Sequence, residues 1–227
     1  SFNSTKGVKL PYVMYDGSQG WQKISSGTTN NGSVRFDIIK TGRYVIMSAQ
    51  GNIGDIPPGH WAEEYIKSLA SKYDLSDVFQ GISNSFMPDN YVTSREVVLL
   101  YEKVTGKTQE NAGLDIRRKN ARLGLSSIIS PNSLMRNVKR QETAAILLKL
   151  FSVKKGAGSE KIIPGGRVWI ADVSSIGDDY YSSVLVIVDM DVMSLDENGR
   201  FHPDRFMTRA EVAAAFVRLL EITGELS

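Results

Sequence analysis

Residues 201–211, FHPDRFMTRAE, and residues 86–96, FMPDNYVTSRE, match in residue type and spacing. Each stretch begins with Phe-x-Pro-Asp. Seven residues after the phenylalanine, a threonine opens a four-residue segment that ends in Glu96 or Glu211. Self-similarity of this kind is typical of repeat architectures. The two stretches therefore predict that much of the chain is built from repeated units.

A third segment, KRQE at residues 139–142, leads into an apolar run like the one that follows Glu211. It lacks the Phe-x-Pro-Asp turn, because Asn132 and Leu134 occupy the phenylalanine and proline positions, and it has no counterpart of Trp61. We interpret it as a degenerate middle copy of the repeat.

Apolar residues recur at helical spacing through most of the chain after His60, which predicts a mainly α fold. Thr93 with Glu96, and Thr208 with Glu211, have the spacing of a capping box at a helix start. Gly106 and Gly224 lie where glycine ends a helix. The predicted helices are Trp61–Lys72, Ser94–Val104, Arg140–Phe151, Tyr180–Val188 and Arg209–Ile222.

The first 50 residues have a different pattern, rich in β-branched and aromatic residues and divided by short Gly, Asn and Asp turns. This pattern predicts an antiparallel β-meander of about four strands, which is too small to bury much surface by itself. The periodicity changes near Gly51 to Gly59, where we expect the boundary. The predicted strands are Val8–Tyr15, Trp21–Ile24, Ser33–Ile39 and Arg43–Ser48.

The composition excludes several classes of protein. The 227 residues include no cysteine and only two histidines, so disulfides, thiolate metal sites and cysteine catalysis are excluded, and no cofactor is expected. No apolar run approaches the roughly 18 residues that span a bilayer. Residues 1–20 lack the pattern of a signal peptide, so we expect a secreted parent protein to be represented by a fragment.

Charge is distributed unevenly along the chain. The net charge is zero over residues 1–106, +8 over residues 107–163 and −6 over residues 164–227. A basic face of this kind raises the local concentration of anionic ligands. The alternative is that the basic and acidic segments attract each other. No aromatic residues alternate with Arg117, Arg118, Lys119 and Arg122, so nucleic acid is not an expected partner.

The order Asp, Trp-Ala, Gly, Phe-x-Pro, Thr-Arg-Ala-Glu resembles the S-layer homology family over about residues 52–227, and Thr208–Glu211 carries its tetrapeptide complete. The resemblance implies three tandem helical repeats in a pseudo-threefold arrangement, at residues 52–106, 107–163 and 164–227. A β-strand module at residues 1–51 precedes them. It also implies grooves between the repeats that bind acidic, pyruvylated secondary cell-wall polysaccharide.

Arg209 is the first candidate for contacting such a ligand. A capping box does not require arginine, whereas a guanidinium at a helix start can bind a carboxylate through two hydrogen bonds. Arg140 has the same position in the middle copy. In the first copy Ser94 has that position, and Arg95 is displaced by one residue, or about 100° around the helix.

The resemblance implies further ligand positions, each with a structural alternative. Trp61 and Tyr180 could stack on sugar or pack in the core, and the apolar stripe that includes Trp61 favours the core. Asp55 and Asp172 suit a turn or a sugar hydroxyl equally. Gly81 corresponds to a loop glycine of the family, which Ser194 replaces in the third copy.

The sequence is compatible with three functions. The leading one is non-enzymatic anchoring of a secreted bacterial surface protein to the cell wall, with wall polysaccharide as partner. The second is a degenerate module for assembly with other surface-layer proteins. A glycan-active enzyme ranks lowest, because the recurring carboxylates Glu96 and Glu211 already have capping roles.

Overall fold

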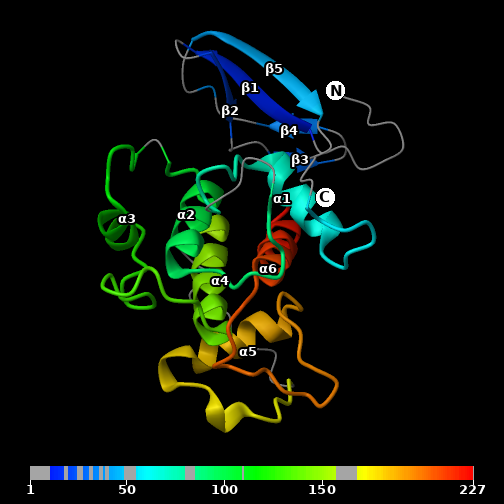
Figure 1. Cartoon of the computed structure of the whole chain (residues 1–227), viewed down its shortest axis with the longest axis vertical. Helices are drawn as coiled ribbons and strands as arrows, with labels where there is room; N and C mark the ends of the chain where they lie inside the picture. The colour runs from blue at the N-terminus through cyan, green and yellow to red at the C-terminus, as the bar shows by residue number, and fades with distance from the viewer. Residues whose placement is uncertain are drawn as a thin grey trace.

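The computed structural model describes residues 11–17, 20–24, 28–30, 33–35, 38, 41–48, 55–79, 85–108, 110–156 and 168–226. Figure 1 shows a small β-sheet at one end of the molecule and helices through the rest. The mainly α fold with a small antiparallel sheet is therefore confirmed.

The strands do not form the expected meander. The larger sheet has the order β2-β1-β5, so the first strand lies in the middle, and β3 pairs only with β4. The turn signal near Asn30 closes the local β3–β4 pair, in which Asn30 lies opposite Ser33. Strand β1 instead pairs with β5, where the rings of Tyr15 and Tyr44 are 5.1 Å apart. The strands are β1 Pro11–Gly17, β2 Gly20–Ile24, β3 Thr28–Asn30, β4 Ser33–Arg35 and β5 Arg43–Ser48.

All five predicted helices are present; two of them differ from the prediction at one end, and α5 is shifted by one residue at both ends. The α-helices are α1 Glu63–Lys72, α2 Ser94–Val104, α3 Ile116–Arg122, α4 Arg140–Lys155, α5 Tyr181–Asp189 and α6 Arg209–Ile222. Helix α3 was not predicted. Its start is fixed by Asp115, whose carboxylate accepts the amides of Arg117 and Arg118.

The capping boxes of α2 and α6 are confirmed. Thr93 accepts the amide of Glu96, and Glu96 accepts the amide of Thr93; Thr208 and Glu211 repeat the exchange. These reciprocal bonds satisfy amides that have no partner within the helix. Both helices consequently begin at the predicted residue.

Three short segments that precede α2, α4 and α6 are joined in a closed ring of backbone hydrogen bonds. The amide of Val92 donates to Met207 at 2.9 Å, Val138 donates to Val92 at 3.0 Å, and Met207 donates to Val138 at 3.0 Å. The first amide of each helix extends the ring: Ser94 donates to Arg136, Arg140 to Arg205, and Arg209 to Asn90, each at 2.9 Å. Each segment thus contacts both of the others in the same way.

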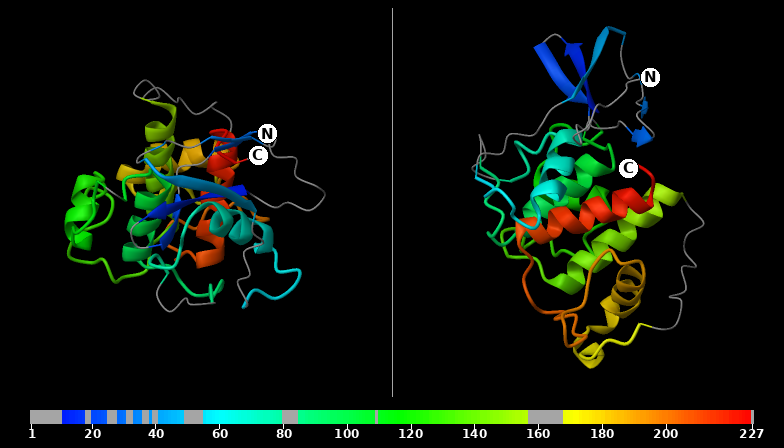
Figure 2. Two further views of the ribbon diagram at one scale, coloured as in Figure 1. Left: turned by 90° about the horizontal axis from the view of Figure 1, so that it is seen from above. Right: turned by 90° about the vertical axis from the view of Figure 1, so that its right-hand side faces the viewer.

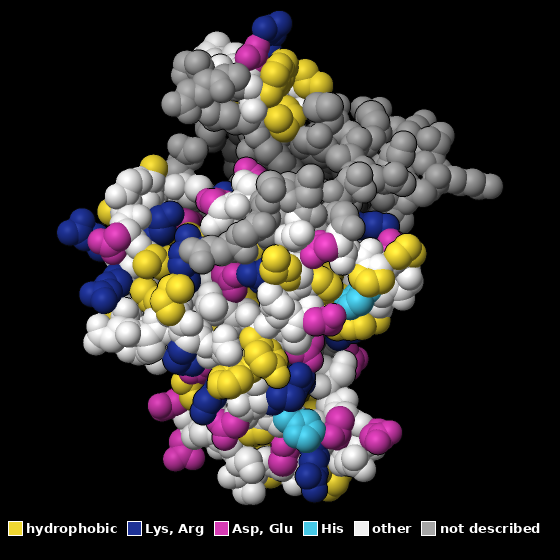
Figure 3. All heavy atoms as spheres, in the orientation of Figure 1, with side chains coloured by type: hydrophobic (Ala, Val, Ile, Leu, Met, Phe, Trp, Pro, Cys, Tyr) yellow, Lys and Arg dark blue, Asp and Glu magenta, His cyan; other side chains and the backbone are white. Residues whose placement is uncertain are grey.

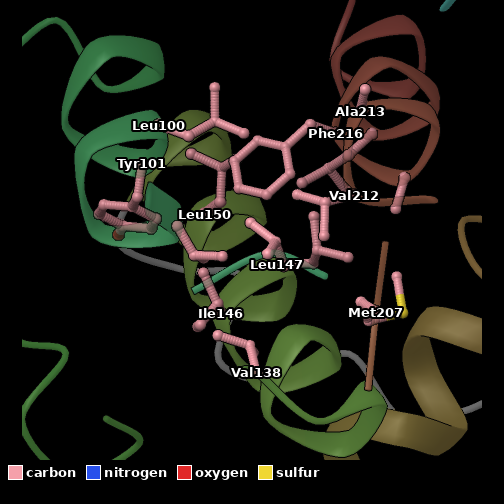
Figure 4. Close-up of a cluster of buried hydrophobic side chains, with 14 of the residues drawn as sticks. Leu100, Tyr101, Val138, Ile146, Leu147, Leu150, Met207, Val212, Ala213 and Phe216 are labelled. Carbon is pink, nitrogen blue, oxygen red and sulfur yellow. The ribbon is translucent and has the colours of Figure 1, made fainter. Parts of the chain in front are cut away.

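The core lies where α2, α4 and α6 meet. Leu100, Leu147 and Phe216 come one from each helix and are fully buried (Figure 4). Helix α1 packs on α6, and α5 packs on α4. Figure 2 shows α4 and α6 side by side, with α5 beyond them at the end away from the sheet. This packing places the loop after α5 next to the first turns of α4 and α6.

Candidate functional site

A groove of about 260 Å³ opens between α6 and the loop that follows α5. Its walls come from parts of the chain that are distant in sequence. Glu211 and Arg218 project from α6, residues 192–196 form the loop wall, Arg140 comes from the start of α4, and Trp61 comes from the segment before α1. The site therefore forms only when these segments pack together.

The groove is lined by more basic than acidic side chains. Arg140, Arg200, Arg205 and Arg218 line it together with His202, against the carboxylates of Asp196 and Glu211. The backbone amide of Arg200 lowers the pKa of Asp196 most, followed by His202, whose Nε2 lies 2.6 Å from Asp196 Oδ2, and by the amide of Asn198. Because the Asp196 carboxylate already has these internal partners, the arginines give the groove the positive charge expected of an anion-binding site.

Arg140 lies at the base of the groove, with 8% of its surface exposed. Its Nε donates to the carbonyl of Phe201 at 2.7 Å, and Nη2 donates to the carbonyl of Ser194 at 2.9 Å. Burial, with a smaller contribution from the charge of nearby Arg205, lowers the pKa of Arg140 to about 10. The carboxylate of Glu211 is 3.9 Å away, too far for a hydrogen bond.

Arg218 reaches the same loop from α6. Its Nη1 donates to the hydroxyl of Ser194 at 3.4 Å, and the guanidinium lies 5.3 Å from the centre of the Tyr65 ring. Within the described part of the chain, Arg218 forms no ion pair with a carboxylate. Arg140 and Arg218 therefore meet at Ser194, and their main contacts are to neutral groups.

Trp61 forms the outer edge of the groove. Its side chain is 57% exposed, and its ring stacks on His60 at 5.8 Å. The expectation that Trp61 packs in the core is wrong. Helix α1 begins at Glu63, so Trp61 precedes the helix and does not continue the apolar stripe of Ile66 and Leu69.

Comparison with known families gives one match. The S-layer homology domain matches residues 170–213, which include the loop wall of the groove and the start of α6. The chain contains an S-layer homology domain. Domains of this family are generally binding modules that anchor proteins to cell-wall polysaccharide, and they are not catalytic. The domain indicates a protein of the cell surface or cell wall. No curated protein matches the chain.

Two general findings accompany this match. Among residues that the structure describes, no helix is both long and apolar enough to cross a membrane. In the same residues, no group of three or more His, Asp or Glu side chains is arranged to hold a metal ion.

Arg209 belongs to the tetrapeptide of the S-layer homology domain but does not line the groove. It is 6% exposed, and its Nη2 lies 2.6 Å from the carboxylate of Glu96. Its Nη1 donates to the carbonyl of Phe86 at 3.0 Å. Arg209 thus repeats the carbonyl contact of Arg140 with Phe201, but it already has an internal carboxylate partner.

The two predicted aspartates have matching roles in turns. Asp55 accepts the amides of Phe86 and Met87 at 2.6 and 2.5 Å, and Asp172 accepts those of Phe201 and His202, both at 2.7 Å. Met87 and His202 have φ of 52° and 56°, a conformation that needs such support in residues other than glycine. Both carboxylates therefore hold the Phe-x-Pro turns, as the turn alternative expects.

Neither Tyr180 nor Arg95 lines the groove. Tyr180 is half-buried beside the core, and burial raises its pKa. Arg95 is partly buried, and its Nη1 has no hydrogen-bond partner among the described residues. Gly81 lies outside the described residues.

Arg218 was not among the residues predicted from the sequence, although a signal was present. A basic residue follows the first residue of α2, α4 and α6 by nine positions in each case, at Lys103, Lys149 and Arg218. This recurrence marks a shared position on the three helices. The recurrence does not predict which group the basic residue contacts, because Lys103 forms an ion pair with Asp77 at 2.8 Å.

The basic residues of α3 form a separate surface. Arg117, Arg118 and Arg122 are exposed, and Figure 3 shows basic side chains over the α3 region at the left of the molecule. In the described residues, the ion pairs of this helix go to Glu102 and Asp115, not to the acidic third segment. The basic and acidic segments do form ion pairs elsewhere; for example, Lys139 Nζ lies 2.7 Å from Asp204 Oδ1.

Proposed function

We propose that this chain anchors a secreted bacterial surface protein to the cell wall by binding acidic, pyruvylated secondary cell-wall polysaccharide. The observation that carries the proposal is the pair of guanidinium groups, Arg140 and Arg218, that meet at Ser194 in the groove. The chain itself has no catalytic role in this proposal.

The chemistry of the groove suits a pyruvyl ketal. The ketal adds one carboxylate to a sugar, and arginine binds a carboxylate through charged hydrogen bonds. Trp61 offers an exposed aromatic face at the edge of the same groove. An acidic sugar can therefore place its carboxylate beside Arg140 and Arg218 and its apolar face against Trp61.

We also propose that residues 52–106, 107–163 and 164–227 are three tandem repeats about a pseudo-threefold axis, preceded by a β-module at residues 1–51. The closed ring of Val92, Val138 and Met207 supports this, because each segment donates to one neighbour and accepts from the other. The matching contacts of Arg140 with Phe201 and Arg209 with Phe86 support it further.

A second candidate is a module for assembly with other surface-layer proteins. It is favoured by the loss of ligand chemistry at two of the three helix starts. Ser94 replaces arginine in the first segment, and Arg209 is paired with Glu96 in the third. Under this alternative, the chain would bind another surface protein and not the wall glycan.

Retention on purified cell-wall sacculi tests the proposal. We expect the protein to sediment with sacculi, to remain soluble when the secondary polymer has been extracted, and to bind weakly when the ketal has been hydrolysed. Arg218→Gln should weaken binding by about 10- to 100-fold, since a charged hydrogen bond contributes roughly 1.5–3 kcal/mol.

Arg118→Gln is the matched control, because it removes the same charge from an exposed site outside the groove. Equal retention on sacculi with and without the polymer would contradict glycan binding and favour the assembly alternative. Equal binding to intact and ketal-free polymer would contradict the carboxylate contact.

A further inference from the structure

The three helix starts differ, among other positions, at the one that lies three residues before the helix cap. That position is Asn90 before α2, Arg136 before α4 and Arg205 before α6. The glutamate at the third residue of each helix, Glu96, Glu142 or Glu211, caps the helix in all three cases. The residue at the variable position decides what else this glutamate can contact.

Where the variable position is arginine, it binds the glutamate of its own segment. Arg136 donates to both carboxylate oxygens of Glu142, at 2.5 and 2.8 Å. Arg205 likewise donates to both oxygens of Glu211, through Nη1 at 3.2 Å and through Nη2. Such paired hydrogen bonds fix the orientation of a carboxylate.

Where the variable position is Asn90, the glutamate binds an arginine of another segment. Glu96 pairs with Arg209 at 2.6 Å, and only 7% and 4% of these side chains are exposed. The corresponding distance between Arg140 and Glu211 is 3.9 Å. Arg140 and Arg209 occupy equivalent helix positions, so the different distances follow from the different partners of Glu96 and Glu211.

We propose that Arg205 is a positioning residue that holds Glu211 away from Arg140 and so keeps Arg140 available to an anionic ligand. This inference rests on the proposed binding of an acidic wall glycan in the groove. In the absence of Arg205, Glu211 turns to Arg140 as Glu96 turns to Arg209. The internal carboxylate then occupies the site of the ligand's carboxylate.

Arg205 also lines the groove, so a direct contact with the ligand is the competing explanation. A double substitution separates the two. Arg205→Asn should weaken binding of purified pyruvylated wall polymer, measured by calorimetry, by at least tenfold. Adding Glu211→Gln should restore binding to within about threefold of the wild type, because the competing carboxylate is gone while glutamine still completes a capping box.

Two single variants serve as controls. Arg205→Lys keeps a cation beside Glu211 and should bind nearly as the wild type does. Arg136→Asn breaks the equivalent pair with Glu142, but Ser94 takes the place of arginine at the neighbouring helix start, so binding should not change. Unchanged binding by Arg205→Asn would overturn the inference, as would a double variant that remains as weak as Arg205→Asn.

The geometry can be tested without the glycan. A crystal structure of the Arg205→Asn variant should show the Arg140 Nη1 to Glu211 Oε1 distance shortened from 3.9 Å to hydrogen-bond length. If the wild type does not bind the polymer but this distance shortens, the proposed function fails and the positioning role of Arg205 stands. An unchanged distance would overturn the positioning role whatever the ligand.

Discussion

Arg209 and Glu96 form a buried ion pair, 2.6 Å long, between residues that are 113 positions apart in the sequence. The pair links the start of α6 to the start of α2, and the Arg209 guanidinium also lies 5.4 Å from the centre of the Phe79 ring. Its burial and its internal partner favour a structural role for Arg209. The ligand role of Arg209 stays a prediction.

Replacing Arg209 with alanine should lower the free energy of unfolding by about 3–5 kcal/mol, because Glu96 would remain buried without its partner. Urea unfolding followed by circular dichroism measures the effect. Arg95→Ala, in a residue that is only partly buried, should cost less than about 1 kcal/mol. Equal losses for the two variants would contradict the structural role of the pair.

Trp61→Ala should weaken polymer binding substantially and leave stability nearly unchanged. Tryptophan is enriched among the residues whose truncation costs about 2 kcal/mol or more in binding. The side chain is 57% exposed, so the free energy of unfolding should change by no more than about 0.5 kcal/mol. Calorimetry with purified polymer and thermal unfolding measure the two effects.

Trp169→Ala is the control for Trp61→Ala. Trp169 is 73% exposed and lies outside the groove. Its replacement should leave both binding and stability unchanged. If both tryptophan variants bound equally well, the aromatic face of Trp61 would have no part in recognition.

Local signals allowed the starts of α2 and α6 to be predicted to the residue, because a capping box involves only four neighbouring positions. The position of Arg140 at an equivalent helix start was predictable from the likeness of KRQE and the following apolar run to the segment that begins at Thr208. The family resemblance was supported by the tetrapeptide ending at Glu211. These features depend on residues close together in the sequence.

Features that depend on distant packing could not be predicted. The partner of Arg209 is Glu96, 113 residues earlier in the chain, and no pattern near Arg209 reveals this. The exposure of Trp61 depends on where α1 begins, and helical spacing alone placed it in the core. The strand order depends on β5 returning to β1 past a local hairpin.

The buried side chain of Met207, a residue of the closed backbone ring, should contribute strongly to stability. Met207 is 1% exposed and both donates and accepts within the ring. Met207→Ala should reduce the free energy of unfolding by about 2–5 kcal/mol through the cavity it leaves. Met135→Ala is the control, since Met135 is 66% exposed, and should change it by no more than about 0.5 kcal/mol. Similar values for both would contradict a packed centre.

The buried ammonium of Lys72 predicts an unusual pH dependence of stability. Lys72 is 5% exposed, donates to the carbonyl of Glu225 and lies 3.9 Å from its carboxylate, which Lys154 also contacts at 2.7 Å. Burial lowers the pKa of Lys72 to about 8; the carboxylate of Glu225 acts against this, and the charge of Lys154 adds to it.

Between pH 8 and 10 the unfolded chain keeps the Lys72 proton, because an unperturbed lysine has a pKa of about 10.4, whereas the folded chain loses it. The unfolded state then binds more protons, so the contribution of Lys72 to the free energy of unfolding rises with pH in this window. Urea unfolding from pH 7.5 to 10 should show the wild type gaining stability relative to Lys72→Met. Lys67→Met is the control, because the pKa of Lys67 is raised in the folded state. The difference in free energy of unfolding between the wild type and Lys67→Met should stay nearly constant over the same pH range. A flat or falling difference for Lys72→Met would show that Lys72 keeps its proton in the folded protein.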